Sequence, residues 1–156
     1  FLRACVSKYG HGIEVALNKL TQEQLKWLEA LPGTLEVQIK EWNFLLCHGA
    51  PWSTNQYIYP DSDTTLKNKC LMNAYDVVLI GHSHYSFSYE NLSRRLLNPG
   101  SVGQNRKKGG TAEWILFDLE TGVAEHCETV YSTQKTIEEA KQLDPDIPYL
   151  REVLQR

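Results

Sequence analysis

Two short apolar runs predict strands that are buried on both faces of a sheet. They cover residues 42–47 and residues 77–80, and turn-forming or polar residues follow each run. Runs of this length and composition are typical of strands whose two faces are both covered. Residues 35–39 instead alternate between apolar and polar side chains, which predicts a strand with one buried face.

Helical periodicity and capping residues predict the helices. Thr21 and Gln24 form a capping-box pattern that begins a helix, and the pair Pro32-Gly33 ends it. A shorter helix is predicted over residues 13–20. Three more helices are predicted over residues 63–73, 136–143 and 149–155.

The second half of the chain predicts a turn and a hairpin. Residues 85–89 and 94–97 are separated by a turn at Glu90-Asn91. The hairpin covers residues 114–119 and 123–130, joined across Glu120-Thr121-Gly122. Strands mixed with helices, without a repeat, low-complexity tract or linker, predict an α/β fold with mixed sheets. We expect residues 1–156 to form a single domain.

Composition and charge exclude some classes of function. The chain has 156 residues, 42% of them hydrophobic and 22% charged, with a net charge of −3. This charge argues against general nucleic-acid binding or attraction to an anionic membrane. No apolar stretch reaches the length of a transmembrane helix, and nothing at the start is typical of a signal peptide.

The four cysteines indicate a reducing compartment. They are scattered and form no Cys-x-x-Cys pair, which leaves a zinc finger without support. Cys47 lies inside an apolar run, where we expect a reduced, buried thiol. A cytoplasmic location is therefore expected.

Three histidines stand at the ends of the two buried strands. His48 precedes Gly49, and Gly81 precedes His82-Ser83-His84. A spacing of two places the imidazoles of His82 and His84 on one side of an extended chain. Neutral imidazoles suit zinc, manganese, iron or nickel, so these residues are candidate metal ligands. A lone His-x-His is also common in surface or core positions without a metal, and we assign His11 and His126 no role.

The order of these motifs resembles that of the calcineurin-like metallophosphoesterases, especially their small bacterial and archaeal phosphodiesterase branch. The succession is Cys47-His48-Gly49, then Gly81-His82-Ser83-His84, then residues 98–106, with residues 27–32 as a further similarity. The resemblance implies a divalent-metal-dependent hydrolase of phosphate mono- or diesters that uses a metal-activated water. It implies that His48 and His82 bind one metal ion and that His84 binds a second.

Residues 98–106 are similar to a family segment with a structural role. We expect residues 98–104 to pack beneath the site and to lead the chain into the last hairpin. Arg106 suits bidentate binding of a phosphate. However, the adjoining residues 107–110 favour placing it in a mobile surface loop.

The family's amino-terminal motifs are absent from this sequence. It contains no Asp-x-His, no Gly-Asp and no Gly-Asn, and it begins at Phe1. The resemblance therefore implies a truncated chain: a partial four-layer αββα sandwich that lacks its amino-terminal strands. Two neighbouring ions need a bridging negative group that imidazoles do not supply. The catalytic residues and the activity of the chain by itself are left open.

Two other interpretations of the same residues remain. The chain could be a non-enzymatic, degenerate family member that acts as a binding or assembly module. Alternatively, its histidines could hold a single structural metal. Missing strands would expose apolar edges, which we expect self-association or a separate amino-terminal segment to cover.

Overall fold

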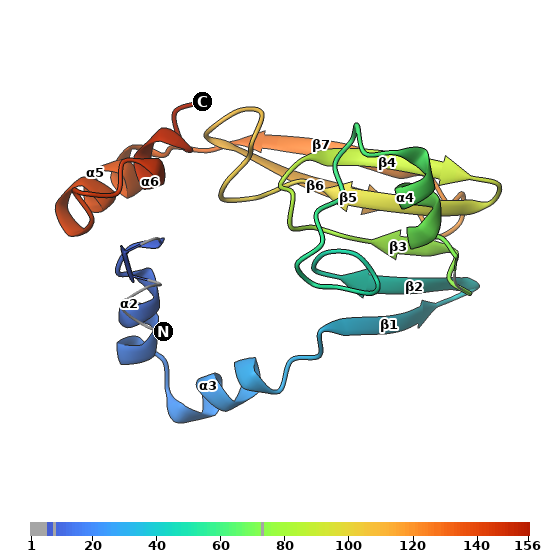
Figure 1. Cartoon of the computed structure of the whole chain (residues 1–156), viewed down its shortest axis with the longest axis horizontal. Coiled ribbons are helices and arrows are strands. Elements are labelled where there is room, and N and C mark those ends of the chain that lie inside the picture. The colour runs from blue at the N-terminus through green and yellow to red at the C-terminus, as the bar shows by residue number, and fades with distance from the viewer. Residues whose placement is uncertain (1–5, 8, 73) are drawn as a thin grey trace.

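A five-stranded mixed sheet lies on the right-hand side of the molecule in the view of Figure 1. The computed structural model describes residues 6, 7, 9–72 and 74–156. The strands are β1 (Thr34–Ile39), β2 (Trp42–Cys47), β3 (Val77–Leu79), β4 (Ser86–Asn91) and β5 (Arg94–Pro99), in the order β1-β2-β3-β5-β4. The three inner strands are parallel, and β1 and β4 pair antiparallel at the two edges. The predicted α/β class with mixed sheets is confirmed.

The inner strands are covered on both faces because successive side chains point to opposite sides. Leu45 and Val78 join a cluster that includes Cys70 and Leu71, at the end of helix α4 (Thr64–Cys70). Phe44 and its neighbours pack on the opposite face. That face is covered by a two-stranded sheet of β6 (Thr111–Phe117) and β7 (Ala124–Val130). These two strands form the hairpin that the sequence predicted.

The turn between β4 and β5 differs from the sequence prediction. The strands pair as far as Asn91 with Arg94, so the turn is formed by Leu92 and Ser93 instead of Glu90 and Asn91. Leu92 has a φ of 57° and is 94% exposed. A left-handed backbone suits a two-residue hairpin turn, but an apolar residue gives no sequence signal for it.

The edge strand β1 is less buried than its alternating pattern predicted. Val37 packs against the cluster around Phe44. Leu35 and Ile39 lie on the same face of the strand and remain 48% and 43% exposed. No strand pairs with the outer edge of β1 in the part of the chain that the structure describes. This edge is therefore open both along its backbone and on one apolar face.

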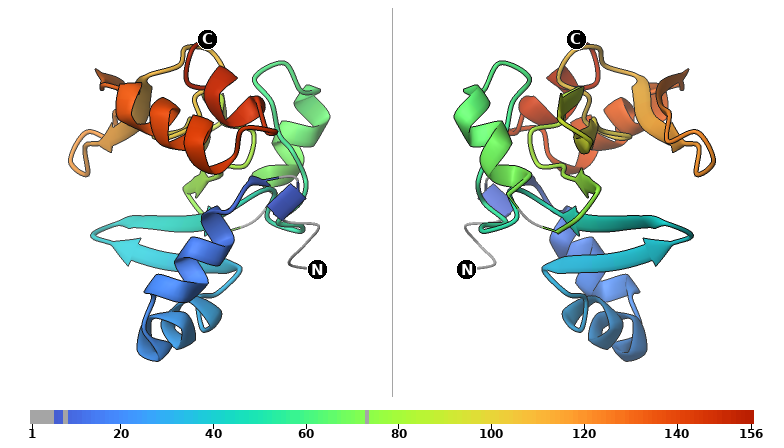
Figure 2. Two further views of the ribbon diagram at one scale, coloured as in Figure 1. Left: turned by 90° about the vertical axis from the view of Figure 1, so that its left-hand side faces the viewer. Right: turned by 90° about the vertical axis from the view of Figure 1, so that its right-hand side faces the viewer.

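Two helices at the start of the described chain extend away from the sheets (Figure 2). They are α2 (Gly12–Lys19) and α3 (Gln22–Glu29), and neither contains a buried residue. The capping box of α3 is confirmed: the Thr21 hydroxyl accepts from the Gln24 amide at 3.2 Å, and the Gln24 side chain accepts from the Thr21 amide at 2.8 Å. Local capping thus defines a helix that gains little from packing.

The carboxyl-terminal helices form a separate group at the other end of the chain. They are α5 (Gln134–Leu143) and the short α6 (Tyr149–Glu152).

None of the helices in the described part of the chain has the length and apolar character that spanning a membrane requires. Cys47 and Cys127 carry free thiols, and burial raises the pKa of the Cys70 thiol to about 11. Cys5 lies outside the described residues.

A polar contact between His11 and Asp144 joins the two helical groups. The His11 Nδ1 atom lies 2.6 Å from the Asp144 carboxylate, which also accepts from the His11 backbone amide at 3.0 Å. The side-chain hydrogen bond to Asp144 is the main reason that the pKa of His11 is raised. His11 was assigned no role from the sequence, and the structure gives it an architectural one.

This pair predicts a stability that falls as pH rises. Because the folded-state pKa of His11 is raised, its contribution is fully present below its unfolded value of about 6.5 and is lost as pH rises through the folded value. We expect His11→Gln, which keeps a hydrogen-bonding side chain but does not titrate, to remove this pH dependence. Urea unfolding at about pH 5.5 and about pH 8.5 measures it. An equal pH dependence in both proteins would contradict the assignment.

Candidate metal centre

The imidazoles of His48 and His82 meet at the carboxyl ends of two neighbouring parallel strands. His48 directly follows β2, and His82 follows β3 after two residues. The His48 Nε2 atom lies 2.8 Å from the His82 Nδ1 atom. A backbone hydrogen bond of 2.9 Å from the Gly81 amide to the His48 carbonyl holds the two loops together. Open α/β sheets place ligand sites at such strand ends.

The backbone at the two downstream histidines differs from the extended chain that the spacing predicted. His82 and His84 have φ values of 62° and 59°, in the left-handed region. For residues with a Cβ atom, this conformation costs roughly 1–2 kcal/mol each, and it persists only where the surroundings enforce it. The imidazoles are therefore placed by a strained turn and not by strand alternation.

Asn98 supplies the contacts that hold this turn. Its side chain is fully buried, and its amide nitrogen donates to the Gly81 carbonyl at 2.9 Å and to the Ser83 hydroxyl at 3.0 Å. Its amide oxygen accepts from the Gly100 backbone at 2.9 Å. A buried amide with all these partners is rigid. This agrees with the structural role expected for residues 98–104, although β5 includes Asn98 and Pro99.

The ring of His84 is oriented by a backbone carbonyl. Its Nδ1 atom lies 3.0 Å from the carbonyl oxygen of Gln104, which can only accept. In the neutral ring, the proton therefore resides on Nδ1, and Nε2 carries the free lone pair. Carbonyl partners of this kind commonly orient histidines that bind metals. No local pattern of residues indicates this contact.

The pair of His48 and His82 fits two ligands of one divalent ion. Two nitrogens that bind one ion at about 2.0–2.1 Å stand roughly 3 Å apart, close to the observed separation. Burial, followed by the neighbouring His48, lowers the pKa of His82 and favours the neutral form that can bind a metal. Among the described residues, no three His, Cys, Asp or Glu side chains form a metal-binding group. The structure thus brings His48 and His82 together without adding His84 to the same group, and the metal-binding roles of all three stay a prediction.

Tyr57, which the sequence predicted to lie in a loop with exposed aromatic residues, packs against the imidazole pair. The ring of Tyr57 stacks on that of His82, with centroids 3.8 Å apart and planes at 28°. Tyr57 in turn lies nearly parallel to Tyr59, at 5.6 Å. The loop carrying these tyrosines follows His48 in the chain, so it returns across the strand ends and packs against the second histidine.

Arg106 is more buried than its predicted place in a surface loop implied. Its side chain is half-buried, and its guanidinium lies 5.7 Å from the centre of the Tyr149 ring. The following loop is held by a hydrogen bond of 3.0 Å from the Gly109 amide to the Arg156 carbonyl. Arg106 thus packs against the carboxyl-terminal helices, while the neighbouring Lys107 and Lys108 are exposed, as expected of a surface loop.

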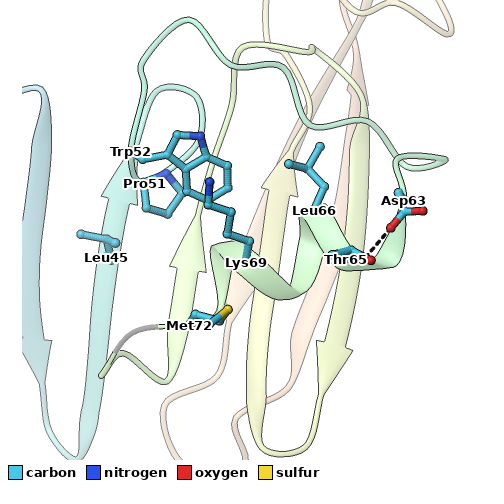
Figure 3. A pocket seen from close by; sticks show the side chains of 8 residues that line it. All are labelled: Leu45, Pro51, Trp52, Asp63, Thr65, Leu66, Lys69 and Met72. Carbon is cyan, nitrogen blue, oxygen red and sulfur yellow. Dashed lines mark hydrogen bonds between the residues drawn. The ribbon is translucent and has the colours of Figure 1, made fainter.

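The remaining histidine and a neighbouring hollow lie apart from the imidazole pair. His126 on β7 lies between the hydroxyls of Ser86 and Ser88, at 2.6 Å from each. An apolar hollow of about 760 Å³ lies between β2 and α4 (Figure 3). It contains no imidazole, and Lys69 lies over the Trp52 ring at its rim, at 4.1 Å.

Comparison with known proteins gives the class that this fold and these motifs define. The calcineurin-like phosphoesterase superfamily domain matches residues 14–122, and the chain belongs to this family. An uncharacterized protein of Methanocaldococcus jannaschii is 30% identical in an alignment that covers 85% of this chain and 60% of that protein.

Two solved structures share the fold. A hypothetical protein of Pyrococcus horikoshii superposes with a TM-score of 0.76 and 24% identity, covering 89% of this chain and 56% of that one. A metallophosphoesterase of Sphaerobacter thermophilus superposes with a TM-score of 0.71 and 21% identity, covering 88% and 62%. The chain therefore spans about 60% of the length of the relatives that it matches.

The glycine after His48 predicts a localised sensitivity to substitution. A Cβ atom at Gly49 would lie 2.6 Å from the Thr54 carbonyl oxygen and 2.8 Å from that of Gln56. We expect Gly49→Ala to lower the free energy of unfolding by about 1–3 kcal/mol, because the backbone must move to relieve this overlap. Urea unfolding measures the loss.

Gly103→Ala is the matched control for this substitution. A Cβ atom there meets no atom within 4 Å. Equal unfolding free energies for Gly49→Ala and the unchanged protein would show that the loop after His48 is not closely packed.

Proposed function

We propose that the protein takes part in the metal-dependent hydrolysis of phosphate mono- or diesters. The observation that carries this proposal is the 2.8 Å approach of His48 Nε2 and His82 Nδ1 at adjacent strand ends, in a chain of the calcineurin-like family. A bound divalent ion would polarise the phosphoryl group and activate a water molecule. In the cell we expect the protein in the cytoplasm.

The residues of this chain have defined parts in that proposal. His48 and His82 would hold one ion, and His84, with Nε2 free, would hold its neighbour. Asn98 would act as a positioning residue, since its contacts enforce the turn that carries both downstream histidines. Manganese, zinc, iron and nickel all suit imidazole ligands.

The negative charge that two adjacent ions require is not supplied by these imidazoles. We propose that acidic ligands come from an amino-terminal segment, because this sequence lacks the family's Asp-x-His and Gly-Asp motifs. On this proposal the present chain binds a divalent ion weakly, and full turnover requires the added segment.

Removing either imidazole of the pair should weaken metal binding. We expect His48→Ala and His82→Ala to reduce the affinity for Mn²⁺ by more than about tenfold, because even the loss of an outer-shell partner costs that much. Calorimetric titration of the chelator-treated chain with Mn²⁺ measures the affinity. His126→Ala is the control, since that ring lies between two serines of β4 and not at the imidazole pair. An unchanged affinity in His82→Ala would refute the ligand assignment.

A second candidate function is assembly through the open edge of β1. Leu35 and Ile39 leave an exposed apolar face on an edge strand, and such edges pair readily with other chains. This supports either self-association or the docking of an amino-terminal segment, without requiring any catalysis.

Sedimentation at increasing protein concentration tests self-association. We expect the chain to form dimers or larger species, and Leu35→Lys to shift it toward the monomer, because a charge on an edge strand opposes pairing. Leu92→Lys changes an equally apolar, exposed residue in a turn and serves as the control. A monomeric chain at all concentrations would rule out self-association.

A further inference from the structure

The apolar hollow between β2 and α4 has a buried floor and an exposed rim (Figure 3). Leu45 on β2 forms the floor and is 7% exposed, whereas Trp52 and Met72 at the rim are 40% and 80% exposed. Its volume of about 760 Å³ lies within the range of small-molecule sites, which are lined mainly by apolar side chains. The hollow therefore has the size and lining of a site for an apolar ligand.

Two segments of the chain form the walls of this hollow. Leu66 and Lys69 are three positions apart on α4, so they lie on the same side of that helix. Pro51 and Trp52 belong to the loop that follows β2. Leu66 also packs against the core cluster that contains Leu45. The shape of the hollow is therefore set by the same packing that holds α4 on the sheet.

The two charged residues that line the hollow differ in their partners. The carboxylate of Asp63 accepts from the Thr65 amide at 2.6 Å and thereby caps α4. Lys69 instead extends from α4 toward Trp52, and its ammonium lies 4.1 Å from the centre of that ring (Figure 3). No carboxylate in the described part of the chain forms an ion pair with Lys69. An aromatic ring attracts a cation but does not neutralise its charge, so Lys69 can still pair with an anion.

We propose that the hollow binds a small aliphatic carboxylate, whose chain lies along Leu45, Leu66 and Met72 and whose carboxylate pairs with Lys69. The apolar lining suits the chain, and the charge of Lys69 selects an anion. A chain fits better than a flat ring, because the ammonium already occupies one face of Trp52. No histidine lines the hollow, so this site is separate from the imidazole pair and does not depend on metal-dependent hydrolysis.

Titration with ligands that differ in chain length or charge tests the proposal. Octanoate, butanoate and octylammonium are titrated calorimetrically into the chelator-treated chain. We expect octanoate to bind at least about tenfold more tightly than butanoate, because its longer chain removes more apolar surface from water. We expect octylammonium to bind at least about tenfold more weakly than octanoate, because its charge repels Lys69. Equal binding of octanoate and octylammonium would show a non-specific apolar contact and overturn the inference.

Lys69→Met tests the charged contact and keeps a long side chain. We expect it to weaken octanoate binding by about tenfold, because a hydrogen bond to a charged group contributes on this scale. Lys26→Met removes the same charge from α3, away from the hollow, and should leave the octanoate affinity unchanged. Circular dichroism confirms that both variants are folded. An octanoate affinity in Lys69→Met equal to that of the unchanged chain would contradict the pairing.

A second copy of the chain is the competing occupant of the hollow. Met72→Gln replaces an exposed apolar side chain with a polar one of similar length. On our proposal it weakens octanoate binding and leaves the sedimentation of the chain unchanged. If Met72→Gln instead converts an oligomer to the monomer, the hollow is an interface between copies and the inference is wrong. Because the titrations contain no metal, their result is independent of the Mn²⁺ titration that tests the proposed function.

Discussion

The buried side chain of Asn98 determines the geometry of the candidate site. Its amide group binds the backbone of Gly81 and the hydroxyl of Ser83, between which the chain turns through a left-handed conformation at His82. An aspartate of the same shape would lack the two donors, and an alanine would leave the Gly81 carbonyl short of a partner. The conformation that brings His82 to His48 is therefore enforced from the adjacent strand β5 and not by the sequence of the turn itself.

Packing on both faces of the sheet gives this turn a rigid base. Phe44 and Leu45 face opposite layers, as do Val77 and Val78, so β2 and β3 cannot shift in register without exposing apolar surface. The strand ends, and the histidines that follow them, are therefore held at fixed positions relative to each other. Membership of the calcineurin-like family gives this arrangement of histidines a chemical interpretation. Because the matched relatives are longer than this chain, the source of the acidic ligands stays a proposal.

The fold class follows from sequence, because apolar runs are local signals, whereas the pairing of His48 with His82 was implied by the resemblance of the motif order to that of the family. The sequence predicted the hairpin turn at Glu90-Asn91, but the strands pair as far as Asn91 and Arg94. The turn therefore includes Leu92, an apolar residue whose left-handed backbone has no signal in the sequence. The stacking of Tyr57 and the carbonyl partner of His84 depend on segments that meet only after folding. Alternation also overestimated the burial of β1, because no pattern within a strand reveals whether another layer covers it.

The contact between His11 and Asp144 has a consequence for how the chain reaches this structure. The two residues are 133 positions apart, so their pairing closes most of the polypeptide into one loop. The entropy lost on closing a loop grows only logarithmically with its length, but contacts of such separation slow the search for the native topology. The sheet contacts span shorter loops, and their formation would bring the two helical groups within reach of each other. Folding would then end at this pair, where the first described helices join the last.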